Sequence, residues 1–161
     1  MRILGIDPGY AIIGYGLLDY VNSRFHTAGY GAITTDAETP FSQRLVIIDD
    51  KIDKLYEAAK PDAISIEKLY FVNNVTTGIA VAEARGIILM RAERHGIPVY
   101  EYTPLQVKQA VTGYGKAEKA QVMEMTRALL GLESIPKPDD AADALAMAIC
   151  HGHASVSHYI K

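Results

Sequence analysis

The residues best suited to chemistry in this sequence are four acids that lie far apart along the chain: Asp7, Glu67, Asp140 and Asp143. Two of them follow short apolar runs, at residues 3–6 and 63–66, as acids at the ends of buried strands do. The other two are three residues apart, so on a helix both would leave the same face. Like charges that crowd together repel one another strongly unless a cation lies between them. A fold that gathers these acids would therefore form a metal site.

The type of metal and its chemistry follow from the ligands. Carboxylate oxygens are hard ligands that suit Mg²⁺ or Mn²⁺. The single cysteine, Cys150, excludes an internal disulfide and a multi-cysteine zinc site. Two divalent ions can stabilise both the attacking and the leaving oxygen when water hydrolyses a phosphodiester. We expect Asp7 to bridge two such ions, with Glu67 on one of them. Asp140 and Asp143 would bind the other.

Structural roles for the same acids are open alternatives. Asp7 stands before Pro8-Gly9 and could be a turn residue. Asp139, Asp140 and Asp143 could cap a helix and complement its dipole. If one of the adjacent pair is a ligand, the sequence does not decide between Asp139 and Asp140.

The histidines near the C-terminus are poor candidates for metal ligands. His151 follows Asp143 by eight residues, about 12 Å along a helix, which is too far to bind the same metal. His153 and His158 are expected to be solvated.

The elements that must position these residues follow from the hydrophobic spacing. Glycine-punctuated runs predict three N-terminal antiparallel strands, and two further strands are expected, at about 3–6, 12–18, 25–33, 63–67 and 99–102. Helical spacing with proline and glycine stop signals predicts helices at about 41–59, 74–95, 103–113, 117–130 and from 139 onward. This order predicts an α/β fold with a five-stranded mixed sheet and helices on both faces.

The helix expected at 74–95 is apolar around most of its circumference. A helix of this kind is usually covered on several sides. One face would pack on the sheet. The other would be covered either by the same chain or by a second copy of the protein.

Length and composition favour a single cytosolic domain. The chain has 161 residues, 49% of them hydrophobic, which suits a single domain over residues 1–161. Asp7, Pro8 and nearby glycines interrupt the start of the chain before a secretory segment could form. No run approaches the roughly 20 apolar residues that cross a bilayer. We therefore expect a cytoplasmic protein.

The distribution of charge is more informative than its sum. A net charge of −3 argues at first against a nucleic-acid partner, because phosphate binding favours a basic surface. Residues 68–127, however, hold 8 Lys and Arg against 5 Asp and Glu. Bound divalent metals would neutralise several acids elsewhere. Contacts with phosphate are therefore expected from the middle of the chain.

Six short segments together match one known family in order and spacing: Gly5–Gly9, Ile66-Glu67, Ala82–Gly86, Gln106–Gln109, Ala117–Lys119 and Asp140–Ala146. They resemble the RuvC crossover-junction endodeoxyribonucleases, which resolve Holliday junctions and have a ribonuclease H-like fold. The resemblance spans nearly the whole chain. It implies that the four acids bind two Mg²⁺ ions per subunit, with Mn²⁺ able to substitute. It also implies a homodimer and a possible branch-migration complex of the RuvA and RuvB type.

The resemblance also implies residues that contact DNA. Lys108 and Lys119 match basic positions near the scissile phosphate, whereas an arbitrary lysine on a helix is solvated. Tyr70 matches an aromatic that stacks on bases opened at the crossover, although a core aromatic is the alternative there. Three further basic residues could extend the track along the DNA arms: Lys68, Arg85 and Lys116.

The predicted function is a metal-dependent endonuclease that resolves four-way DNA junctions in recombination and repair. A homodimer explains paired, symmetric nicks, because two sites related by one axis can cut two strands related by the axis of the junction. One alternative is another ribonuclease H-like nuclease, for instance one that acts on RNA. The other is a junction-binding module without catalysis, whose acids are only structural.

Overall fold

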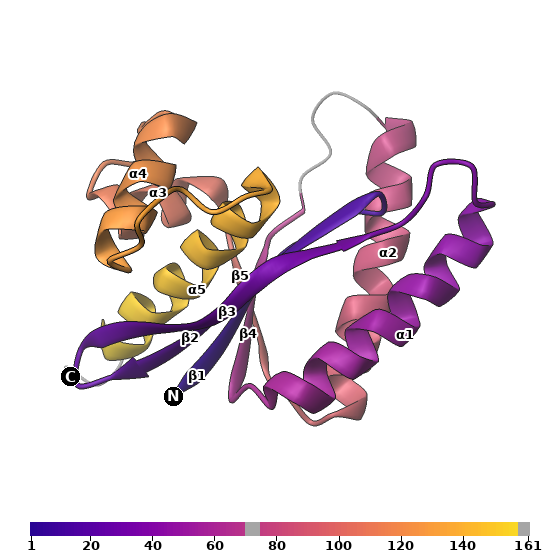
Figure 1. Cartoon of the computed structure of the whole chain (residues 1–161), viewed down its shortest axis with the longest axis horizontal. Helices are drawn as coiled ribbons and strands as arrows, with labels where there is room; N and C mark the ends of the chain where they lie inside the picture. The colour runs from indigo at the N-terminus through magenta and orange to yellow at the C-terminus, as the bar shows by residue number, and fades with distance from the viewer. Residues whose placement is uncertain (70–74, 158–161) are drawn as a thin grey trace.

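A five-stranded mixed sheet lies at the centre of the molecule, as predicted (Figure 1). Its strands in chain order are β1 (Arg2–Asp7), β2 (Ile12–Val21), β3 (Arg24–Thr34), β4 (Ala63–Glu67) and β5 (Val99–Tyr102). Their order across the sheet is β3-β2-β1-β4-β5. The first three strands pair antiparallel, whereas β4 and β5 run parallel to β1. The computed structural model describes residues 1–69 and 75–157 of the chain.

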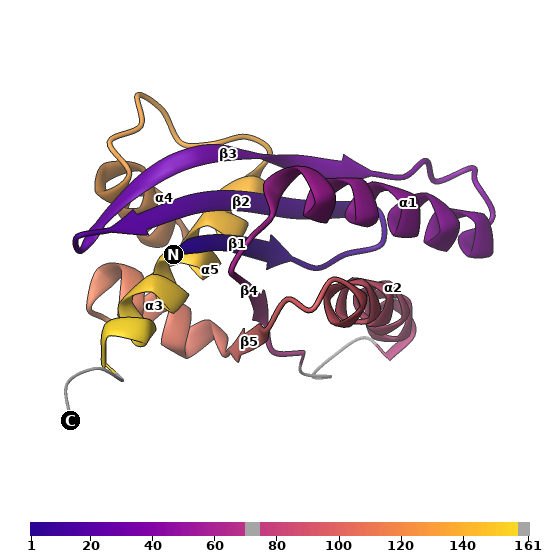
Figure 2. The same cartoon turned by 90° about the horizontal axis from the view of Figure 1, so that it is seen from below.

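Helices cover both faces of the sheet, and this prediction is also confirmed (Figures 1 and 2). The helices on one face are α1 (Phe41–Ala59) and α2 (Val75–Arg94). Those on the other face are α3 (Pro104–Thr112), α4 (Lys119–Leu129) and α5 (Asp139–Ser157). Successive side chains of β1 point to opposite faces of the sheet and so belong to both hydrophobic layers. Ile3 packs with α5, while Leu4 and Ile6 pack with α1 and α2. None of the helices in the described ranges is long and apolar enough to cross a membrane.

The helix α4 begins two residues later than the sequence spacing predicts. Glu118 is its N-cap, and the side chain of Glu118 accepts a hydrogen bond from the backbone three residues on. The side-chain oxygen Oε1 of Gln121 in turn accepts the N–H of Glu118 at 2.9 Å. This reciprocal cap places Lys119 in the first turn of the helix, where its side chain can reach α5.

The helix α5 lies directly against bare backbone of the sheet. A Cβ atom at Gly5 would lie 1.8 Å from the carbonyl oxygen of Ala144, and one at Gly14 would lie 1.9 Å from that of Asp140. No residue larger than glycine fits at either position without movement of the helix. The first turns of α5 therefore come close to the carboxyl end of β1, where Asp7 lies.

The opposite layer is joined by ion pairs. Arg91 on α2 pairs with Asp49 and, at 3.0 Å, with Asp53, both on α1. His95 Nε2 lies 2.8 Å from Oδ1 of Asp53. We call these four residues the α1–α2 ion cluster. Hydrogen bonds from Arg91 lower the pKa of Asp49, and the hydrogen bond with His95 is the main cause of the lowered pKa of Asp53.

Candidate functional site

Strand pairing brings two of the predicted acids side by side. The strands β1 and β4 are parallel neighbours in which Ile6 pairs with Ile66. The next residue in each strand is Asp7 or Glu67, so both acids lie at the same edge of the sheet. Side chains two residues apart share a face, and Asp7 therefore points to the same side as Gly5, toward α5.

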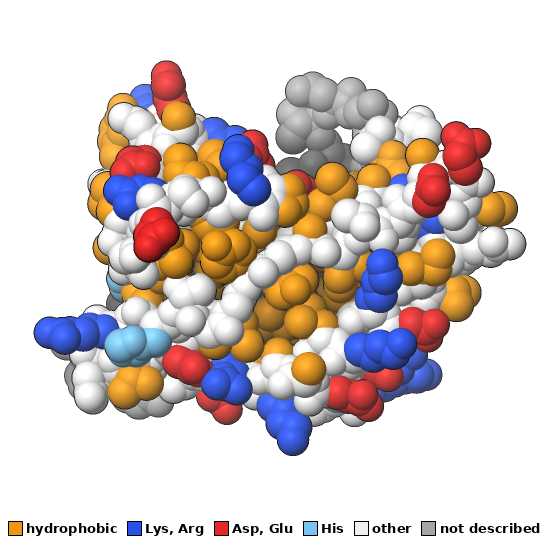
Figure 3. All heavy atoms as spheres, in the orientation of Figure 1, with side chains coloured by type: hydrophobic (Ala, Val, Ile, Leu, Met, Phe, Trp, Pro, Cys, Tyr) orange, Lys and Arg blue, Asp and Glu red, His pale blue; other side chains and the backbone are white. Residues whose placement is uncertain are grey.

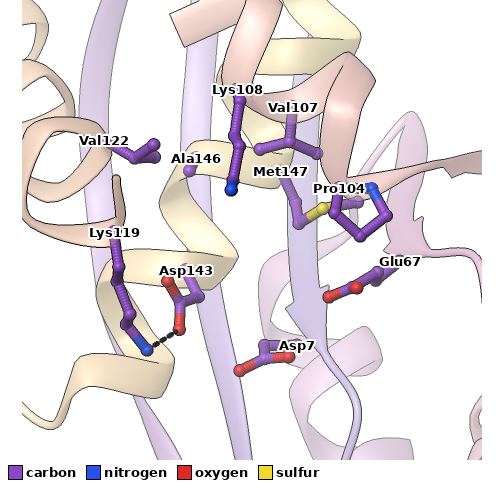
Figure 4. A pocket seen from close by; sticks show the side chains of 10 residues that line it. All are labelled: Asp7, Glu67, Pro104, Val107, Lys108, Lys119, Val122, Asp143, Ala146 and Met147. Carbon is purple, nitrogen blue, oxygen red and sulfur yellow. Dashed lines mark hydrogen bonds and ion pairs between the residues drawn. The ribbon is translucent and has the colours of Figure 1, made fainter. Parts of the chain in front are cut away.

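Asp143 completes a pocket with these two acids. The pocket has a volume of about 300 Å³ and lies between the sheet, α3, α4 and α5. In Figure 4, Asp7 lies between Asp143 and Glu67, and the three carboxylates face one common space. Three of the four predicted acids are thus gathered from three separate parts of the chain.

Burial and neighbouring negative charge raise the pKa of Asp7 and of Glu67. Burial is the main cause that raises the pKa of Asp7 to about 7, and the charges of Asp143, Glu67 and Asp140 add to it. Burial and the charge of Asp143 likewise raise the pKa of Glu67. The pocket therefore holds more negative charge than its own cations balance.

Lys119 supplies part of that balance. Its Nζ donates a hydrogen bond to Oδ2 of Asp143 at 2.8 Å (Figure 4). This hydrogen bond raises the pKa of Lys119, and the lysine lowers the pKa of both Asp7 and Glu67. The side chain of Lys119 is 59% exposed, so it can reach a ligand in the pocket as well as Asp143.

Asp140 lies one turn before Asp143 and is not part of the pocket lining. Its backbone packs on Gly14, and its charge is close enough to raise the pKa of Asp7. The neighbouring Asp139 is turned to a different partner, because its carboxylate pairs with Lys137 at 2.7 Å. Of these two residues, Asp140 has the stronger electrostatic connection to the pocket.

Two further predicted lysines, Lys108 and Lys68, line the pockets that hold the acids. Lys108 extends from α3 into the pocket from the side opposite Asp7 (Figure 4). Lys68 is exposed and lines an adjoining pocket of about 330 Å³ that also includes Asp7 and Glu67. Lys116 is exposed just before α4. Figure 3 shows the hollow between the α3–α4 side and the α2 side of the molecule, with acidic and basic side chains along it.

Of the other two predicted DNA contacts, only Arg85 lies within the described residues. Arg85 is turned inward, with a side chain that is 12% exposed and a guanidinium paired with Glu101 on β5. Burial lowers its pKa. In this arrangement Arg85 ties α2 to the sheet and does not face the pocket, and a DNA contact by Arg85 stays a prediction. Tyr70 lies outside the described residues.

The donors fit a hard divalent cation in type, although not yet in spacing. Within residues 1–69 and 75–157, no three acidic, histidine or cysteine side chains stand close enough together to hold a metal ion as they are placed. Asp7, Glu67 and Asp143 nevertheless line one pocket. The negative charges of Glu67 and Asp143 act on Asp7, and a bound cation would relieve this repulsion. Rotation of the side chains on this fixed backbone would be needed to close the ligand set.

Sequence reasoning missed the apolar wall of the pocket. Val107, Val122, Ala146 and Met147 line it beside the acids. The helical spacing of these residues indicated only that they are buried, because core and pocket-lining residues share the same pattern.

Comparisons with known proteins agree with this geometry. The family profile described as crossover junction endodeoxyribonuclease RuvC matches residues 3–151. A protein of that description from Ruminiclostridium cellulolyticum is 54% identical over 153 residues, which cover 95% of this chain and 92% of the relative. The structure of Thermus thermophilus RuvC superimposes with a TM-score of 0.91 at 32% identity, covering 98% of this chain and 97% of that one. The same protein in complex with a Holliday junction substrate gives a TM-score of 0.89 at 30% identity, covering 98% and 96%.

Proposed function

We infer that this chain, which belongs to the RuvC family of crossover junction endodeoxyribonucleases, cuts four-way DNA junctions with the pocket around Asp7, Glu67 and Asp143. Membership of the family makes it a metal-dependent nuclease that resolves Holliday junctions in recombination and repair. One observation carries the assignment of the site: acids from two parallel strand ends and from α5 face one cavity with an excess of negative charge.

The metals that we propose are two Mg²⁺ ions in each subunit, replaceable by Mn²⁺. When bound, such ions activate the attacking water and stabilise the leaving 3′ oxygen. Asp7 would serve both ions, and its position between Glu67 and Asp143 supports this proposal. Asp140 would join on the α5 side after a change of side-chain conformation.

The lysines of the pocket would bind the scissile phosphate. Lys108 and Lys119 extend from α3 and α4 toward the acids, so that they can contact phosphate oxygens and offset the charge that develops during cleavage (Figure 4). Lys68 and Lys116 would extend this positive track along the DNA arms. Stacking of Tyr70 on an opened base stays a proposal from the family resemblance. The nicks would leave 5′-phosphate and 3′-hydroxyl ends.

We propose a homodimer that packs through α2. Its outer face carries Ile79, which is 51% exposed, and Met90, which is 40% exposed. Gly86 lies between them with no atom within 4 Å of a Cβ position, so another helix can approach closely there. An apolar helix face of this kind favours a partner. Twofold symmetry would then give two paired nicks.

The family resemblance and the DNA substrate also suggest where the protein acts and with which partners. We propose that the protein acts in the cytoplasm, where it would meet recombining DNA. We also propose that residues 1–161 act as one nuclease domain and cooperate with a branch-migration motor of the RuvA and RuvB type.

Cleavage of matched substrates tests the proposal. A synthetic immobile four-way junction, a linear duplex and an RNA–DNA hybrid are incubated with the protein, with and without Mg²⁺. We expect paired nicks only in the junction and only with Mg²⁺, and no nicks with the Asp7→Asn variant. Preferential cleavage of the hybrid would identify a nuclease that acts on RNA. Junction binding without nicking at any Mg²⁺ concentration would identify a binding module.

A further inference from the structure

Three elements that carry residues of the site meet at Tyr102, the last residue of β5. Tyr102 pairs with Glu67 in the parallel register of β4 and β5. Its carbonyl oxygen accepts the N–H of Lys68 at 2.8 Å. The backbone of Tyr102 therefore fixes the chain immediately beyond Glu67.

The next residue begins the helix that carries Lys108. The side-chain oxygen Oγ1 of Thr103 accepts the N–H of Gln106 at 3.2 Å, and Oε1 of Gln106 accepts the N–H of Thr103 at 2.8 Å. This capping box defines the start of α3, so the end of β5 determines where Lys108 enters the pocket.

The side chain of Tyr102 reaches the third element, α5. Its hydroxyl lies 2.7 Å from Nδ1 of His151, a residue that is 4% exposed. The ring of His151 also stacks on Tyr100, with ring centres 4.3 Å apart. Because Asp143 lies about two turns earlier on the same helix, this contact joins the helix of Asp143 to the strand beside Glu67.

The hydrogen bond between Tyr102 and His151 joins two uncharged groups. Burial is the main cause that raises the pKa of Tyr102 to about 12, so its hydroxyl keeps the proton. Burial lowers the pKa of His151, so the ring is neutral at pH 7. A neutral imidazole has one donor and one acceptor nitrogen, so the tautomer of His151 decides which of the two partners donates. In either direction, loss of the hydroxyl would leave the buried Nδ1 unpaired.

Of the five strands, β5 has the least contact with α5, and the Tyr102–His151 pair lies there. On β1 and β2 the helix is seated by the close approach at Gly5 and Gly14. On β4, Oγ of Ser65 donates to the carbonyl oxygen of Met147 at 2.7 Å. Next to β5 the polar tie is the Tyr102–His151 pair. A buried polar pair that is fully satisfied selects one arrangement of the elements that it joins.

We propose that Tyr102 and His151 are positioning residues for the cleavage reaction, and that their hydrogen bond sets the separation of Asp143 on α5 from Glu67 on β4. The pair lines neither of the pockets that contain these acids. The inference rests on the proposed function, because it takes both acids as ligands of one metal site. Partners that orient metal ligands from outside commonly tune metal affinity.

The first test removes one oxygen atom. In the Tyr102→Phe variant, we expect affinity for Mn²⁺ to fall on the order of tenfold, measured by electron paramagnetic resonance of the free ion. The Mg²⁺ concentration for half-maximal nicking should rise by the same factor, while the rate at saturating Mg²⁺ stays within about twofold. Tyr100→Phe is the matched control, since within the described residues the hydroxyl of Tyr100 has no hydrogen bond. It should bind Mn²⁺ like the wild type.

A second pair of variants separates positioning from a merely structural role. His151→Asn keeps a polar atom at the position of Nδ1, one bond from Cγ, that can pair with the hydroxyl of Tyr102, whereas His151→Leu has none. We expect Asn to restore most of the Mn²⁺ affinity and Leu to lose as much as Tyr102→Phe, at a temperature where circular dichroism shows all variants folded. Equal Mn²⁺ affinity in Tyr102→Phe and wild type would overturn the inference, as would an equal loss in Tyr100→Phe. Failure of the wild type to bind Mn²⁺ would instead overturn the proposed function itself.

Discussion

Two groups of acids in this molecule have opposite electrostatic surroundings. In the α1–α2 ion cluster, Asp49 and Asp53 both pair with Arg91, Asp53 also has a hydrogen bond with His95, and the pKa values of both acids are lowered. In the pocket, burial and like charge raise the pKa values of Asp7 and Glu67, and Lys119 offsets this only in part. The acids that join α1 to α2 are thus paired with a basic side chain of the chain itself, Arg91. The acids of the pocket leave a charge that a ligand must balance, which distinguishes a site from a structural ion pair.

The largest expected effect is on catalysis. Asp7→Asn should reduce nicking of a four-way junction by on the order of a thousandfold or more, since metal-ion stabilisation of the transition state is worth several kcal/mol. Asp49→Asn changes an acid in the same way within the α1–α2 ion cluster and should leave the rate nearly unchanged. Single-turnover cleavage at saturating Mg²⁺ measures both. A comparable loss in the two variants would remove the distinction between the two groups.

The next effect concerns stability of the metal-free protein as a function of pH. A folded-state pKa of about 7 for Asp7 lies above the ordinary 3.8, so the folded protein holds this proton more tightly than the unfolded chain does. The contribution of Asp7 to stability is therefore greatest below about pH 4 and is lost as the pH rises toward 7. In EDTA at pH 7.5, Asp7→Asn should be more stable than the wild type by up to a few kcal/mol, and the gain should vanish near pH 4. Urea denaturation at the two pH values measures this; a gain that is independent of pH would contradict it.

Replacement of Lys119 should have a smaller effect, and it should raise the affinity for metal rather than lower it. Its ammonium group repels any cation that binds beside Asp143, so Lys119→Met should bind Mn²⁺ more tightly, by on the order of tenfold. Nicking at saturating metal should nevertheless fall, because a phosphate contact is lost. Lys137→Met is the control, since Lys137 pairs with Asp139 outside the pocket. Isothermal titration with Mn²⁺ would refute the idea if Lys119→Met bound the ion more weakly than Lys137→Met.

The smallest effect is expected in the α1–α2 ion cluster. Its acids are partly exposed, and ion pairs of that kind contribute little to stability because solvent screens them. Asp49 has a lowered folded-state pKa, so its stabilisation is present above the ordinary pKa and is lost as the pH falls. Thermal melting of Asp49→Asn should show a loss of a few degrees at pH 7 and almost none near pH 3. The pH dependence is thus opposite to that expected for Asp7→Asn.

Local patterns in the sequence predicted much of this fold. The five strands and five helices appear near their expected positions because hydrophobic periodicity is written into neighbouring residues. The acids Asp7 and Glu67 could be placed for the same reason, since both end apolar strands. Their roles in metal binding stay a prediction.

Contacts between distant segments could not be predicted in the same way. Nothing in the sequence indicated that the guanidinium of Arg85 pairs with Glu101, 16 residues further along the chain, and a DNA contact by Arg85 stays a prediction. His151 was set aside because it lies too far along the helix from Asp143, whereas its partner Tyr102 comes from 49 residues away in the chain. Propensity and spacing do not encode which side chain of one element meets which of another.

The seat of α5 on Gly5 and Gly14 has a consequence for how this enzyme family can vary. Peptide groups in direct contact do not compress, so over β1 and β2 the distance of α5 from the sheet is defined by main-chain atoms, whereas next to β5 it depends on the side chains of Tyr102 and His151. Substitutions among the large aliphatic residues under α1 and α2 can then accumulate without shifting α5 over β1 and β2. Evolution is free to redesign one side of the sheet while the geometry of the reaction stays the same.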